Sequence, residues 1–245
     1  MTPAVTWATA LRVLTQLRRD PRTVGLIIVV PTLLVAIVRY VFDGRPELFD
    51  RVGGPMLGLF PFISMFLVTS VTMLRERVTG TLERLMTMPL AKLDLLLGYA
   101  LAFALLAAVQ ATFVSGVAIA ALGLDLAGST GAVVGLAIGN ALLGMALGLF
   151  ASAFARTEFQ AVQFMPALVL PQVLLCGLFV PREQMAGWLE GISAALPLTY
   201  SYDALARVTR GAPLTGRFAT DLAVTFGATL LALALGAATL RRRTP

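Results

Sequence analysis

A charged segment, residues 75–92, interrupts a chain that is otherwise mostly apolar. Its sequence, RERVTGTLERLMTMPLAK, contains six ionisable side chains and lies between two apolar stretches. Glu83 and Arg84 are placed for charged contacts, and Leu82 and Leu85 can fill an apolar groove on a partner. Such a loop suits a membrane subunit that receives force from a soluble partner. The alternative is an ordinary loop whose charges are merely solvated.

The composition indicates a membrane protein. Hydrophobic residues make up 58% of the 245 residues, charged residues only 13%, and the mean hydropathy is +0.87. A soluble domain carries roughly 25% charged residues. A spanning helix needs about 20 mainly apolar residues. Six stretches meet this requirement, at about residues 24–42, 55–74, 95–122, 131–154, 162–180 and 222–240. We therefore expect an all-α integral membrane protein with six transmembrane helices in one domain, residues 1–245.

Two further elements are expected outside the spans. In residues 4–20, Trp7 and Leu11 fall on one helical face and Arg12 falls on the opposite face, which favours an amphipathic helix in the membrane interface. Residues 181–220 show helical spacing and are long for a loop without function. They predict a short extracellular helical hairpin before the last span.

The basic residues indicate the orientation. If both termini are cytoplasmic, twelve of the 19 Lys and Arg residues lie on the inner side, including those of residues 75–92. The positive-inside rule therefore favours this arrangement, and it places residues 181–220 outside. The same rule accounts for most of the formal charge of +6, and no DNA-binding motif accompanies the arginines. We expect contact with lipid and none with nucleic acid.

Glycines in the fourth span predict close helix packing. Gly131, Gly135 and Gly139 are four residues apart, so they lie on one side of a helix and permit a neighbouring backbone to approach. Packing within the chain and a subunit interface both remain open. The amides deepest in the spans, Gln110, Asn140 and Gln172, need partners and are expected to face protein.

The second and fifth spans contain residues that could line an apolar route. These candidates are Phe62, Met65, Phe66, Phe164, Met165 and the amide Gln172. Pro166 and Pro171 should bend the fifth span, and bent helices often surround a pathway. The alternative is that the prolines are packing irregularities and that the aromatic and Met side chains pack.

The sequence lacks the residues that acid–base catalysis, a histidine metal site or ATP binding would need. The chain has no histidine, no paired carboxylates in the expected spans and no P-loop sequence. We therefore expect no catalytic residues, no metal site and no cofactor in this chain. A small lipid-modifying membrane enzyme with its site at the hairpin is a rival interpretation, which the missing histidine disfavours. A secondary carrier is a third, which the lack of charges near the expected midplane disfavours.

The charged segment also carries a resemblance. The matching residues are Glu76, Arg77, Gly80, Thr81, Leu82, Glu83, Arg84, Leu85 and Pro89. They closely resemble the loop after the second span of type-2 ABC-transporter permeases, especially the daunorubicin-resistance-like membrane subunits. The N-terminal helix ending in Arg-Asp-Pro and the segment at residues 196–200 extend the resemblance to nearly the whole chain. Val78 departs from it, since many members carry a carboxylate there.

The resemblance implies a role. Permeases of this type dimerise, and each docks a separate ATPase subunit, which binds ATP and Mg, through this cytoplasmic loop. Two ATPase copies would then serve a homodimer in a bacterial-type cytoplasmic membrane. The permease would not itself be an enzyme. ATP-driven closure would push a hydrophobic or amphiphilic substrate, such as a drug, antibiotic or lipid, outward between the second and fifth spans.

Overall fold

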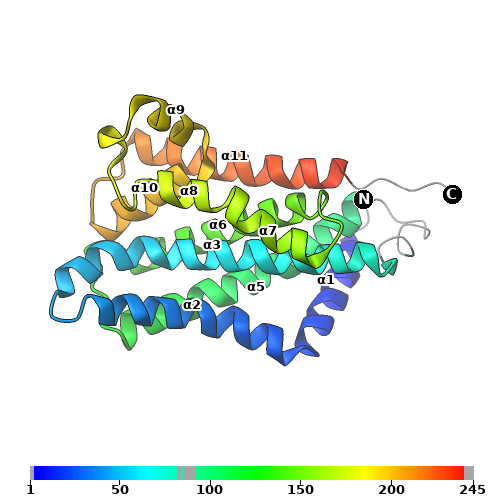
Figure 1. Cartoon of the computed structure of the whole chain (residues 1–245). Coiled ribbons are helices and arrows are strands. Elements are labelled where there is room, and N and C mark those ends of the chain that lie inside the picture. The colour runs from blue at the N-terminus through cyan, green and yellow to red at the C-terminus, as the bar shows by residue number, and fades with distance from the viewer. Residues whose placement is uncertain (1–2, 82–83, 85–91, 240–245) are drawn as a thin grey trace.

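The computed structural model describes residues 3–81, 84 and 92–239. All regular structure in these residues is helical, which confirms the expected all-α class. The helices are α1 (Pro3–Arg18), α2 (Pro21–Val41), α3 (Pro46–Val78), α5 (Lys92–Ala120), α6 (Thr130–Ala151), α7 (Glu158–Leu168), α8 (Leu170–Leu175), the 3-10 turn η1 (Arg182–Gln184), α9 (Gly187–Ala195), α10 (Pro197–Thr209) and α11 (Gly216–Ala238). They form an elongated bundle (Figure 1).

Six segments are long and apolar enough to cross a membrane, as the sequence predicted. Five of them are single helices, namely α2, α3, α5, α6 and α11. The remaining one, which is the fifth span in chain order, consists of α7 followed by α8. Helix α3, which contains the second span, begins at Pro46 and continues through Pro55 and Pro61. At 1.5 Å per residue, its 33 residues extend about 50 Å, more than the hydrocarbon core of about 30 Å. Its ends therefore reach beyond the hydrocarbon.

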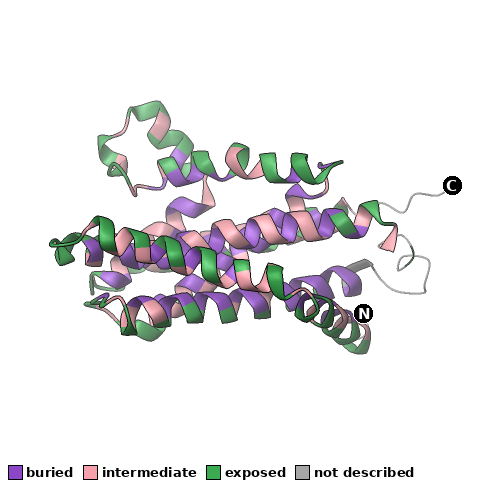
Figure 2. Cartoon of the chain, turned by 60° about the horizontal axis from the view of Figure 1, so that its bottom comes forward, coloured by how far each residue is buried: buried purple, intermediate pink, exposed green. Residues whose placement is uncertain are grey.

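The six spans divide into a central and a peripheral group. In their most apolar windows, α3, α5 and α6 are 61%, 50% and 56% buried, against 17% to 22% for the other three spans. Exposed residues line the outer faces of the bundle (Figure 2). Because these outer faces carry many large apolar side chains, they need lipid or a second chain to cover them.

Helix α1 crosses the bundle axis at a steep angle (Figure 1). The side that packs on the protein consists of Thr9, Ala10, Val13 and Leu17. Trp7 and Leu11 are exposed, which suits a helix lying in the membrane interface. Arg12, on the opposite face of α1, is not simply exposed to solvent. It contacts Glu76 of α3 and Tyr99 of α5.

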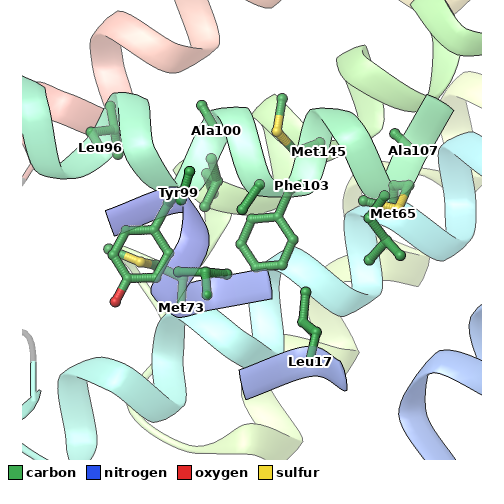
Figure 3. Packing of buried hydrophobic residues seen from close by; sticks show 14 of the residues in the cluster. Leu17, Met65, Met73, Leu96, Tyr99, Ala100, Phe103, Ala107 and Met145 are labelled. Carbon is green, nitrogen blue, oxygen red and sulfur yellow. The ribbon is translucent and has the colours of Figure 1, made fainter. Parts of the chain in front are cut away.

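A cluster of buried side chains joins α1 to the centre of the bundle (Figure 3). Leu17 of α1 meets Met73 of α3, Tyr99 and Phe103 of α5, and Met145 of α6 in this cluster. The rings of Tyr99 and Phe103 are stacked, with centroids 6.5 Å apart. Helix α1 is therefore packed into the core beside the end of α3.

The closest contact between α3 and α6 depends on glycine. A Cβ atom at Gly144 would lie 2.2 Å from the Phe62 carbonyl oxygen, and one at Gly148 would lie 2.4 Å from that of Phe66. No side chain fits there without moving a backbone.

The glycines singled out from the sequence face elsewhere. A Cβ atom at Gly135 or Gly139 would meet no described atom within 4 Å, and one at Gly131 would approach only Ser129, at 3.9 Å. Within one chain, this face of α6 therefore has open space beside it. The step from residue 139 to Gly144 is five residues, about 140° of helical rotation, so the two sets occupy different faces. A subunit interface at Gly131, Gly135 and Gly139 stays a prediction.

The fifth span is divided into two helices at a single residue, close to the prolines that were expected to bend it. Helix α7 ends at Leu168 and α8 begins at Leu170, with Val169 between them. Pro166 lies inside α7 and Pro171 lies in the first turn of α8. Each proline removes one helical hydrogen-bond donor, so the span is interrupted within a few residues.

Gln110 joins three spans in the middle of the bundle. Its side chain is fully buried, and its amide nitrogen donates to the Ile27 carbonyl oxygen at 2.7 Å and to the Ser64 hydroxyl. Pro31 lies four residues after Ile27 and has no N–H to bond that carbonyl within the helix. Gln110 supplies the missing donor, which confirms that this residue faces protein.

The other two deep amides are also buried. Asn140 of α6 accepts a hydrogen bond from the Ser201 hydroxyl of α10. Gln172 donates to the Leu168 carbonyl oxygen at 3.0 Å, across the break in the fifth span. Both residues are less than a tenth exposed, so both face protein.

The segment before the last span is helical, as expected. It consists of η1, α9 and α10, and α9 lies at the end of the bundle (Figure 1). Helix α10 packs against α3, α6 and α11, with Leu205 and Val208 buried. The hairpin thus enters the bundle through α10, and only η1 and α9 stand outside it.

Candidate coupling site

The described part of the charged segment begins as the last turn of α3. Helix α3 ends at Val78, Thr79 follows it, and Gly80 has a φ of 71°. Glycine adopts this left-handed conformation easily, so Gly80 turns the chain out of the helix. Thr81 follows the turn, and the backbone N–H of Arg84 donates to the Gly80 carbonyl oxygen at 3.0 Å. The other predicted coupling residues, Leu82, Glu83, Leu85 and Pro89, lie outside the described residues.

Glu76 is buried at the end of α3, only 4% exposed. Its carboxylate pairs with Arg12 of α1 at 3.4 Å. The Arg12 guanidinium also donates to the Tyr99 hydroxyl of α5 and lies 5.4 Å from the centre of that ring. One charged contact therefore joins α1, α3 and α5 next to the segment. Within one chain Glu76 is a structural residue, and its proposed contact with an ATPase has to coexist with this pair.

A cavity of about 280 Å³ opens beside this pair. Residues of α1, the start of α2 and the end of α3 line it, among them Arg12, Asp20, Arg75 and Glu76. Asp20 caps α2, since it accepts hydrogen bonds from the Thr23 hydroxyl at 2.6 Å and the Thr23 backbone at 3.2 Å. Both bonds lower the pKa of Asp20, and the bond from the Thr23 hydroxyl has the larger effect. Asp20 is therefore ionised at neutral pH. The cavity walls thus carry charges of both signs.

A second charged contact joins α3 to α7. The Arg75 guanidinium donates to both carboxylate oxygens of Glu158, at 2.7 and 3.0 Å. Under it, Leu74, Ala155 and Ala161 form a buried apolar cluster. The end of α3 is therefore tied both to the core helices and to the fifth span. The sequence analysis did not identify Arg12, Tyr99 and Glu158 as partners of the charged segment. The available signal was a charged or polar side chain at the end of an apolar stretch, which needs a partner.

The candidate route residues are mostly packed. Phe62, Met65 and Phe66 are fully buried within the chain, and Phe164 and Met165 are partly buried. Phe62 and Phe66 share a cluster with residues of α6, α8 and α10. This arrangement favours the packing alternative for the residues of α3. The part of the route that a second chain would complete stays a prediction.

Charged pairs also occur at the opposite end of the bundle. Asp203 of α10 lies 3.6 Å from Arg182 and 3.3 Å from Arg217 of α11. Asp221 of α11, 2% exposed, lies 3.9 Å from Arg207. Among the described residues, no three His, Cys, Asp or Glu side chains gather in a way that could hold a metal ion.

Comparison with known proteins agrees with this geometry. The family model described as ABC-2 type transporter matches residues 4–209. Over 164 residues, 66% of this chain, the sequence is 27% identical to "ABC transporter G family member 20" of Dictyostelium discoideum, of which it covers 22%. Over 148 residues, 60% of this chain, it is 29% identical to "Probable multidrug ABC transporter permease YbhR" of Escherichia coli (strain K12), of which it covers 40%. The chain thus spans less than half the length of either relative. Because the family model covers most of the chain, this multi-pass membrane protein belongs to the ABC-2 type transporter family.

Proposed function

We propose that this chain is the membrane subunit of an ATP-driven exporter whose ATP hydrolysis is done by separate ATPase subunits. The observation that carries the proposal is the anchoring of the charged segment. Its first residues form the end of α3, where Arg75 pairs with α7 and Glu76 pairs with Arg12 of α1, which in turn donates to α5. A push on the segment therefore reaches several helices at once. Permeases of this family pair with ATPase subunits, which gives the push its source.

The partners follow from the same segment. We infer that residues 76–89 dock one ATPase subunit per chain and that two permease chains and two ATPases form the working complex. The exposed apolar faces of α2, α7, α8 and α11 leave room for a second permease chain as well as lipid. ATP and Mg would be held by the ATPase.

Two observations support a hydrophobic or amphiphilic substrate: the name of one related protein and the apolar surface of the fifth span. A relative is named as a probable multidrug permease. Residues facing outward on the fifth span are largely apolar, with Phe159, Val162 and Leu174 exposed. Such a surface suits a drug, an antibiotic or a lipid that partitions into the membrane. We propose export between the second and fifth spans, toward the end that carries η1 and α9.

We propose the cytoplasmic membrane of a bacterial-type cell as the location, with both termini inside. Helix α1 and the end of α11 lie at the same end of the bundle (Figure 1), as an even number of spans requires. In a Cys176→Ala background, a cysteine at Thr79 should resist an impermeant thiol reagent in intact cells and react in permeabilised cells. Labelling in intact cells would reverse the orientation.

The test of the function is purification of the tagged chain from its native membrane. The complex should contain an ATPase subunit, and inside-out vesicles should accumulate a hydrophobic drug or labelled lipid only with hydrolysable ATP. Accumulation that follows a proton gradient would instead support a secondary carrier. Chemical alteration of the lipid without transport would support an enzyme.

A further inference from the structure

Arg75 and Glu158 connect the second span to the fifth. Arg75 lies three residues before the end of α3, and Glu158 is the first residue of α7. The guanidinium Nε and Nη2 atoms donate to the two carboxylate oxygens at 2.7 and 3.0 Å. Both side chains are more than half exposed, so the link depends on its geometry: two parallel bonds fix orientation as well as distance, which a single contact between flexible side chains does not.

The first turn of α7 holds Glu158 in place. The Thr157 hydroxyl accepts a hydrogen bond from the Gln160 backbone at 3.2 Å, and the Gln160 side chain accepts one from the Arg156 backbone at 2.8 Å. These bonds cap the helix in the manner of a capping box. A carboxylate in the first turn also suits the helix dipole. Glu158 therefore projects toward α3 from a well-defined helix start.

An apolar layer lies next to the ion pair. Leu74 of α3 is buried with Ala155 and Ala161, and Val71 and Phe164 pack against them. Among the other spans, α3 is the helix against which α7 chiefly packs. Sliding α7 along α3 would have to break the ion pair and open this layer together.

The far end of α7 is less constrained. The span divides at Val169, which keeps its own bond to the Met165 carbonyl oxygen, at 2.8 Å, but lies between Pro166 and Pro171, each of which lacks the N–H of a helical hydrogen bond. Helix α7 can therefore change its angle to α8 without breaking a continuous helix. Helix α7 is thus held to α3 by the Arg75–Glu158 pair at its start and can bend relative to α8 at its end.

We propose that Arg75 and Glu158 are positioning residues that make α7 move with the end of α3, while the fifth span bends at Val169. The proposal rests on the proposed function, in which an ATPase pushes the segment that follows α3. Through this link, one push moves both spans that border the proposed route. No contact between the ATPase and the fifth span is then required.

The test compares four complexes in inside-out vesicles: the parent, Arg75→Glu, Glu158→Arg and the double exchange. ATP hydrolysis and transport are measured on the same vesicles. Each single variant places like charges together, so we expect transport per ATP to fall about five-fold, the lower range of coupling between sites. The exchange restores the pair and should recover most of the ratio. Arg217→Asp, which disrupts the pair with Asp203 at the other end of the bundle, should leave the ratio unchanged.

Parental ratios in the single variants, or an exchange no better than the single variants, would overturn the link. A parent complex without ATP-dependent transport would instead contradict the proposed function. A second experiment joins Arg75→Cys and Glu158→Cys with a bifunctional thiol reagent in a Cys176→Ala background. Retained transport supports helices that move together, whereas loss of transport in the joined protein, but not in treated single-cysteine controls, would mean that they must separate.

Discussion

The two ends of the bundle differ in which helices their ion pairs join. At the loop end, where α3 ends and α5 begins, Arg12 pairs with Glu76 across 64 residues of sequence and Arg75 pairs with Glu158 across 83. At the hairpin end, where η1 and α9 lie, Arg217 pairs with Asp203 across 14 residues. The first pairs join helices that are far apart in the chain. The last joins the consecutive helices α10 and α11.

This difference indicates that the loop end can pass a displacement between helices, whereas the hairpin end mainly holds neighbouring helices together. Four helices, α1, α3, α5 and α7, meet through side chains at the loop end, so a displacement of the segment after α3 is shared among them. At the hairpin end the ion pairs that involve α10 tie it to α11 and η1, and Arg39 of α2 donates to the backbone that follows α5, at Leu122, rather than to an acidic side chain of another helix. Changes at the loop end should therefore affect stability and coupling together, and changes at the hairpin end should affect stability alone.

Glu76→Gln should have the largest effect on stability. The substitution leaves the shape nearly unchanged but removes the charge that pairs with Arg12. Breaking a buried pair costs several kcal/mol, and we expect about 3 kcal/mol because Arg12 is partly exposed to screening. Thermal unfolding of the detergent-solubilised complex measures the loss. The variant Arg12→Gln with Glu76→Gln should lose less than the single variants combined, and strict additivity would contradict the pairing.

Gly144→Leu should come next. Its side chain would collide with the backbone of α3 at Phe62, and overpacking of this kind costs about 1–3 kcal/mol or more. Gly135→Leu is the matched control on the same helix, since a side chain there meets open space within one chain. Equal melting temperatures for the two variants would contradict the packing. A loss confined to the dimer for Gly135→Leu would support the subunit interface.

Arg217→Ala should have the smallest effect. Arg217 and Asp203 share a single contact at 3.3 Å, in place of the two parallel bonds of Arg75, and Asp203 keeps Arg182 as a second partner. Exposed pairs contribute about 0–1 kcal/mol, so the melting temperature and the transport per ATP should stay close to the parental values. A loss of transport at unchanged stability would place the hairpin end in the coupling mechanism and remove the contrast between the two ends.

The sequence predicted the elements better than their contacts. Apolar stretches of spanning length are a strong signal, so all six spans were found, and Pro166 with Pro171 located the break in the fifth. Spacing showed that Gly131, Gly135 and Gly139 share a face, but it carries no information on which face meets a neighbour. That choice depends on the approach of α3 to Gly144 and Gly148.

The partners of the charged residues could not be predicted for a related reason. Arg12, Tyr99 and Glu158 reach the end of α3 from three different helices. Each looks ordinary in its own stretch of sequence, since helical periodicity describes only local neighbours. The sequence did not show that α3 begins as early as Pro46, because one missing donor, at Pro55, does not end a long, packed helix.

The central claim is that the segment following α3 couples this chain to an ATPase, and reversing Glu83 and Arg84 tests it most directly. The double variant, Glu83→Arg with Arg84→Glu, should insert and melt like the parent, because the reversed charges lie beyond α3 and leave the pairs of Arg75 and Glu76 untouched. Like charges brought together at an interface cost several kcal/mol, so ATPase affinity, measured by pull-down and by stimulated ATP hydrolysis, should fall about ten-fold or more. Parental values in both measurements would contradict the account.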